Sequence, residues 1–165
     1  MPTINFLNHA RDSGKISAHT RKVLEELITK SGVPAITITS TTRTADEQAR
    51  IMYENIEAHG VDHQKKLYGP AGDKVIDEYY SLKKLGKSKD QIVNGMTVKI
   101  NALGPGRVSR HAGDSNQINV VDIAPSSINL ALRKKFEDNV KGDSRVSKFL
   151  TPPGDPAYHL EIPQP

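Results

Sequence analysis

Residues 35–60 read AITITSTTRTADEQARIMYENIEAHG and join a strand pattern directly to a helix pattern. Residues 35–41 alternate with β-branched side chains, which is typical of a half-buried strand. Thr44 and Glu47 then have the spacing of a capping box, and apolar residues follow on one helical face. Arg43 therefore lies where a strand meets a helix, and such a junction holds a side chain on rigid supports.

The same signals predict further elements along the rest of the chain. Expected helices cover residues 17–31, 74–86, 88–104 and 126–140, and expected short strands cover 118–123 and 157–162. Stretches rich in Gly and Pro at 68–74, 101–111 and 151–156 are expected to be loops or turns. This order predicts an α+β fold with a small, mostly antiparallel sheet flanked by helices. We expect a single domain of 165 residues, with a helical pair inserted over about 61–104.

The composition is that of a folded, globular protein. Hydrophobic residues make up 36% of the chain and charged residues 25%. The net charge of +4 suits weakly anionic partners, but the lysines and arginines are scattered and no aromatic-rich binding signature accompanies them. Nucleic acid is therefore not an expected partner. No segment approaches the roughly 20 apolar residues of a membrane span. We also expect the protein to be a monomer.

The sequence lacks cysteine and a signal-peptide pattern, which limits the possible metal ligands and the expected place of synthesis. The chain has no cysteine, so a zinc site would have to use histidine and carboxylate ligands. The first residues, MPTINFLNHARDSGK, lack the charged and apolar regions of a signal peptide. We therefore expect synthesis in the cytoplasm.

Three segments place reactive side chains at the ends of predicted strands or beside loops. They carry Arg43, then His111 and Asp122 within SRHAGDSNQINVVD (residues 109–122), and then His159 within YHLEI. Two histidines and an aspartate match the three protein ligands of a catalytic zinc site. From the pattern alone, however, a histidine such as His159 in a terminal strand is more often a core or edge residue, and Asp122 could simply cap the helix that follows.

Four short segments, STTRTADEQARIMY, SRH, VVDI and YHLEI, resemble motifs of the zinc D-alanyl-D-alanine carboxypeptidases and L-alanyl-D-glutamate endopeptidases, which share the Hedgehog-type fold. The segments follow that family's order, and the resemblance spans most of the chain but leaves the inserted helices around 61–104 unaccounted for. The resemblance implies Zn²⁺ as cofactor and stem peptides of bacterial peptidoglycan as substrate. It also implies roles for individual residues: zinc ligands His111, Asp122 and His159, substrate-binding Arg43, and supporting positions Gln48 and Ser109.

The spacing departs from the family pattern between the first two implied ligands. The family usually has a glycine three residues after the first histidine and the aspartate seven after it, whereas Gly113 comes two after His111 and Asp122 eleven after. Asp114, inside the longer loop, is therefore a rival carboxylate ligand. We favour Asp122, because the apolar NVVDI frame would anchor it on a strand.

The position of the catalytic base is the second departure from the family pattern. Asp155, four residues before His159, and Glu161, two after it, are the available carboxylates. Residues two apart in a strand share a face, so Glu161 is expected to orient the imidazole of His159. Asp155 is then slightly preferred as the group that takes a proton from water and delivers it to the leaving amine, while Arg43 balances charge in the transition state.

Two alternatives and one consequence accompany this interpretation. A non-catalytic peptidoglycan-binding module would keep the fold without hydrolysis. Without a signal peptide, a wall hydrolase would act after release or delivery, as a phage lysis enzyme or a toxin does. His59 and His63 are four residues apart, but Gly60 between them disfavours a shared helical face, so a solvated surface is expected there.

Overall fold

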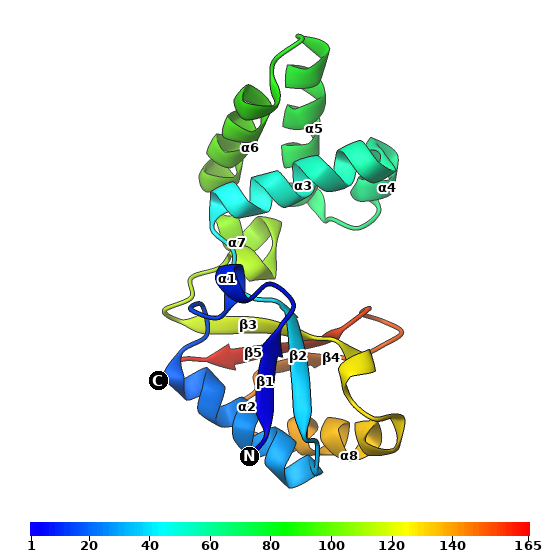
Figure 1. Cartoon of the computed structure of the whole chain (residues 1–165). Coiled ribbons are helices and arrows are strands. Elements are labelled where there is room, and N and C mark those ends of the chain that lie inside the picture. The colour runs from blue at the N-terminus through cyan, green and yellow to red at the C-terminus, as the bar shows by residue number, and fades with distance from the viewer. The chain divides into compact units, whose positions relative to one another are not determined.

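The computed structural model describes residues 1–165 (Figure 1). The strands are β1 (Thr3–Phe6), β2 (Ala35–Ser40), β3 (Ile118–Ile123), β4 (Lys148–Leu150) and β5 (Tyr158–Pro163). The helices are α1 (His9–Asp12), α2 (Ala18–Ser31), α3 (Ala45–His59), α4 (Val61–Lys65), α5 (Pro70–Lys84), α6 (Lys89–Leu103), α7 (Pro105–Val108) and α8 (Leu130–Lys141). Short 3-10 helices occur at η1 (Arg110–Ala112) and η2 (Pro125–Ser127). None of the helices combines the length and the apolar character needed to cross a bilayer.

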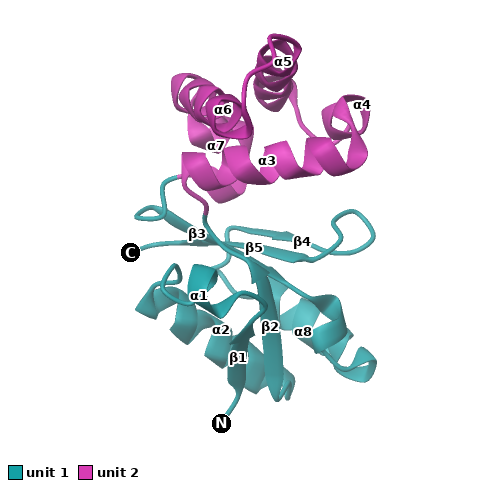
Figure 2. Ribbon diagram, turned by 45° about the horizontal axis from the view of Figure 1, so that its top comes forward, with its two compact units in different colours: residues 1–42, 114–165 teal, residues 43–113 magenta.

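The chain forms two compact units (Figure 2). The first comprises residues 1–42 and 114–165 and contains every strand, whereas the second comprises residues 43–113 and is helical. The predicted α+β class is confirmed. That the chain is a single domain stays a prediction.

The sheet of the first unit has the strand order β1-β2-β3-β5-β4. Strands β1 and β2 are parallel and the other three pairs are antiparallel, so the sheet is mixed but mostly antiparallel, as expected. Helices α2 and α8 share a hydrophobic core with the strands, to which Leu24, Ile36, Val121, Phe136 and Leu160 contribute. The buried residues of β2 alternate with half-buried ones, which confirms the half-buried strand.

Side chains of β5 alternate between two faces of the sheet, with apolar residues on the face that packs in the core and polar residues on the other. Tyr158, Leu160 and Ile162 belong to the core shared with α2 and α8. Since successive strand residues point to opposite faces, His159 and Glu161 lie on the other face. Asp122 of β3 pairs directly with His159, so all three polar residues share that face.

The helical unit has its own core, formed mainly by α3, α5 and α6, and Met52, Ile76 and Met96 are among its fully buried members. Both predicted capping boxes are present: Thr44 with Glu47 begins α3, and Ser88 with Gln91 begins α6. Reciprocal hydrogen bonds of this kind satisfy backbone groups that the first helical turn leaves unpaired.

Several boundaries differ from the sequence prediction, each for a local reason. The stretch 68–74, predicted as a turn, contains the start of α5, because Pro70 suits the first helical position. The helix predicted from 126 begins at Leu130, because the Asn129 side chain accepts a hydrogen bond from the backbone N–H of Ala131 and caps it there. Strands β1 and β4 and helices α1, α4 and α7 were not predicted.

Candidate metal centre

Three side chains predicted as zinc ligands come together in the structure. His111, Asp122 and His159 each offer one ligand atom, and these atoms all lie within 4.8 Å of one another. His111 and His159 are buried and Asp122 is half-buried. This group could hold a metal ion, because two imidazoles and a carboxylate form a donor set that zinc accepts.

The pairing of β3 with β5 sets the distance between two of these side chains. Nδ1 of His159 lies 2.9 Å from Oδ1 of Asp122, directly across the two strands. Two atoms bound to one tetrahedral zinc at about 2.0 to 2.1 Å would be ~3.3 Å apart. The two atoms therefore need only a small displacement to accept a common ion.

Glu161 contacts the other ring nitrogen of His159. Its Oε1 lies 3.1 Å from Nε2 of His159, and the residue is only 4% exposed. Burial by itself lowers the pKa of His159, but the hydrogen bonds to Asp122 and Glu161 and the charges of both carboxylates outweigh it and raise this pKa above its ordinary value. A metal at Nδ1 would thus compete with a proton.

The two remaining predicted carboxylates lie outside this ligand group. Asp114 is exposed, and its Oδ1 accepts a hydrogen bond of 2.9 Å from the backbone N–H of Asn116. Asp155 is half-buried in the turn before β5, and its Oδ1 accepts a hydrogen bond of 2.9 Å from the backbone N–H of Ala157. Both carboxylates are used locally to shape their own turns.

His111 lies in η1, which follows α7. Its carbonyl oxygen accepts a hydrogen bond of 2.5 Å from the backbone N–H of Arg43, which ties η1 to the segment before α3. Ser109 stands between α7 and η1 and is half-buried, and its carbonyl oxygen accepts from the N–H of Ala112. The backbone of Ser109 therefore helps to form the turn that carries His111.

Arg43 and Gln48, both predicted to serve the substrate, contact each other. Nη1 of Arg43 donates to Oε1 of Gln48 at 3.1 Å, and Gln48 has no exposed surface. Gln48 Nε2 donates in turn to the hydroxyl of Tyr68 at 3.2 Å. The sequence prediction missed Tyr68, which stands in a stretch predicted as a turn and carries no local signal for this contact.

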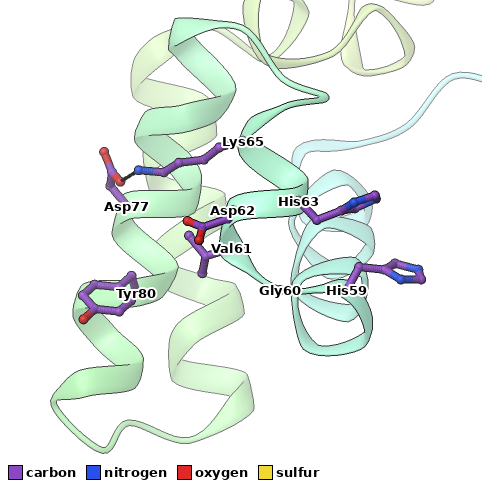
Figure 3. A pocket seen from close by; sticks show the side chains of 8 residues that line it. All are labelled: His59, Gly60, Val61, Asp62, His63, Lys65, Asp77 and Tyr80. Atoms are coloured by element: carbon purple, nitrogen blue, oxygen red, sulfur yellow. Dashed lines mark hydrogen bonds and ion pairs between the residues drawn. The ribbon is translucent and has the colours of Figure 1, made fainter.

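A separate cavity of about 700 Å³ lies beside α4 and α5 in the helical unit (Figure 3). His59 and His63 line it, with ring centroids 5.4 Å apart, and both side chains are exposed, as expected of a solvated surface. Figure 3 shows both imidazoles on the side of the chain away from the bonded pair of Lys65 and Asp77.

Comparisons with protein-family models, with curated proteins and with solved structures gave no match. The resemblance to the zinc peptidase family therefore rests on four short sequence segments alone.

Proposed function

We propose that this chain is a zinc-dependent peptidase that cleaves stem peptides or peptide cross-links of bacterial peptidoglycan, on a Hedgehog-type fold. One observation carries the proposal: the ligand atoms of His111, Asp122 and His159 lie within 4.8 Å of one another. Three protein ligands are the number used by catalytic zinc sites, whereas structural sites use four. The order of the four motif segments along the chain supports the same family.

In this proposal, His159 binds the ion through Nδ1. Its Nε2 then donates to Glu161, which selects one tautomer and holds the ring in place. Asp122 serves as the carboxylate ligand, because it lies 2.9 Å from that nitrogen whereas Asp114 is turned to its own loop. When bound, zinc would supply a Lewis acid that polarises a carbonyl group and makes water a better nucleophile near neutral pH.

The acid–base and substrate-binding roles go to residues outside the ligand group. Glu161 is committed to His159, so we assign proton transfer from water to the leaving amine to Asp155. Arg43 binds a carboxylate or carbonyl oxygen of the substrate through its planar set of N–H donors, and Gln48 and Ser109 support the site. We further propose that the protein acts on the cell wall as a monomer after release or delivery, as a phage lysis enzyme or a toxin does.

Metal analysis of the purified protein tests the ligand assignment. The wild type is expected to bind one zinc ion, and His111→Ala, Asp122→Ala and His159→Ala are each expected to lose it. Asp114→Ala is the matched control and is expected to retain it. Retained zinc in Asp122→Ala, together with loss in Asp114→Ala, would refute this ligand choice.

A non-catalytic peptidoglycan-binding module is the second candidate. It is favoured by one observation, that the carboxylate of the assigned base, Asp155, is bonded within its own turn. Zinc added to metal-free protein should release amine groups from purified peptidoglycan if the chain is a peptidase. Binding to peptidoglycan without released amine or peptide would instead favour the module.

A further inference from the structure

A chain of hydrogen bonds within the helical unit connects the base of α3 to the segment before α5. Arg43 donates to the fully buried Gln48, and Gln48 donates to the hydroxyl of Tyr68, over distances of 3.1 and 3.2 Å. Gln48 and Tyr68 are twenty positions apart, so this contact exists only in the folded unit.

The chemistry of arginine sets the direction of this chain. A guanidinium group only donates hydrogen bonds, so the amide oxygen of Gln48 must face Arg43. The amide nitrogen then faces Tyr68, whose hydroxyl oxygen accepts. Without that hydroxyl, the buried amide would keep an unpaired N–H group, which is unfavourable away from water.

The position of Tyr68 is itself fixed by close packing against the first turn of α5. A Cβ atom added to Gly72 would lie 2.5 Å from Cβ of Tyr68 and 2.7 Å from its Cγ. These atoms form the base of the tyrosine side chain, which has little freedom to move away. The small residue at position 72 therefore lets Tyr68 lie where Gln48 can reach it.

The chain of contacts orients Arg43 without contributing a negative charge. Gln48 is a neutral acceptor, and burial raises the pKa of Tyr68, so its hydroxyl stays neutral at neutral pH. Both contacts in this chain are therefore hydrogen bonds between groups that carry no negative charge.

We propose that Tyr68 is a positioning residue that fixes the guanidinium of Arg43 through Gln48. Within the peptidase proposed above, on which this role in substrate binding rests, Tyr68 presents Arg43 to a substrate carboxylate or carbonyl oxygen. The inserted segment between α4 and α5 thus contributes to substrate binding through a residue outside the four motif segments.

Nitrogen-15 NMR of the arginine side chains in the metal-free protein tests the positioning directly. A guanidinium held at Nη1 rotates slowly and gives separate Nη signals, and the Arg43 signals are assigned from the spectrum of Arg43→Lys. Tyr68→Phe removes only the hydroxyl group that accepts from Gln48, and it is expected to shift the Arg43 signals. Tyr80→Phe, at an exposed position of the same helical unit, is the matched control and should leave them unchanged.

Cleavage kinetics with zinc-loaded protein provide the second measurement. Tyr68→Phe is expected to raise KM for peptidoglycan peptides about fivefold, with kcat changed by less than about twofold, because a binding contact is weakened. Arg43 signals identical in Tyr68→Phe and wild type would overturn the proposal, and so would an unchanged KM. A wild type that releases no peptide contradicts the proposed peptidase instead, and the NMR comparison then decides the role of Tyr68 alone.

Discussion

Oε1 of Glu161 lies 3.1 Å from Nε2 of His159, a contact between two residues of one strand whose side chains share a face. Its geometry is that of a carboxylate holding the outer nitrogen of a metal-binding imidazole. The distance also confirms that the two side chains lie on the same face, as the sequence pattern predicted.

If the proposed zinc site is correct, replacing Glu161 should weaken zinc binding without removing a ligand. Glu161→Ala is expected to lower zinc affinity about 10- to 100-fold, because the imidazole loses the partner that selects its tautomer. Competition with a chelator measures the change, and Glu25→Ala, at an exposed position of α2, is the control. Equal zinc affinity in Glu161→Ala and wild type would exclude this role.

The buried Asn119 connects β3 to the start of α2. Its Oδ1 accepts from the backbone N–H of Ser17 at 2.8 Å and from the hydroxyl of Thr20 at 2.9 Å, and its Nδ2 donates to the carbonyl of Ser115 at 3.0 Å. Asn119→Ala leaves these groups without this partner and should lower the free energy of unfolding by about 2 to 3 kcal/mol. Urea unfolding measures the loss, and Asn116→Ala, at an exposed position of the preceding loop, should change stability by less than about 0.5 kcal/mol.

Asp12 makes the stability of the first unit depend on pH. Burial by itself raises its pKa, but hydrogen bonds from Arg11 and Thr41 and the charges of Arg11 and Lys15 outweigh burial, so the pKa lies below its ordinary value. A carboxylate with a lowered pKa stabilises the fold above its unfolded pKa, and this contribution is lost as pH falls through the folded pKa.

Asp12→Asn should consequently be less stable than the wild type at pH 7, by about 2 kcal/mol, because charged hydrogen bonds are lost. The difference should shrink as the pH falls below about 4. Chemical unfolding across this range measures it, with Asp138→Asn at an exposed position of α8 as the control. A difference that stays constant down to pH 2 would contradict the assignment.

Two helical glycines form a matched pair for testing close packing. A Cβ at Gly72 would meet Cβ of Tyr68 at 2.5 Å, whereas a Cβ at Gly95 would meet the flexible tip of Leu82, and Leu82 can rotate away. Gly72→Ala should therefore destabilise the protein by about 1 to 3 kcal/mol. In Gly95→Ala, the better helix propensity of alanine offsets the repacking, so little change is expected. Helix unfolding followed by circular dichroism compares the two.

Local chemistry was enough to predict the starts of α2, α3 and α6, each of which begins at a side-chain cap. The caps at Ser17, Thr44 and Ser88 all form as the sequence indicated. Strand β1 escaped prediction, because its four residues owe their pairing to β2, more than 25 positions later. A segment this short carries too little pattern of its own, so only the tertiary partner determines its conformation.

The candidate site, too, could be predicted only in part from the sequence. Sequence order and family resemblance indicated His111, Asp122 and His159, but only the fold brings their ligand atoms within 4.8 Å. The choice between Asp122 and Asp114 could not be made from spacing, and cross-strand pairing with His159 now favours Asp122. The contact of Tyr68 with Gln48 could not be predicted from the sequence, because it depends on how α3 packs against the start of α5.

The brevity of β1 and β4 has a consequence for how the protein behaves at high concentration. These two strands end the strand order of the sheet, and they contain only four and three residues. An outermost strand offers its backbone N–H and C=O groups as a template on which another molecule can extend the sheet, and a short strand offers few of them. We therefore expect the sheet to resist growth into fibrous aggregates, so that strand exchange between molecules contributes little to any loss of protein in concentrated solution.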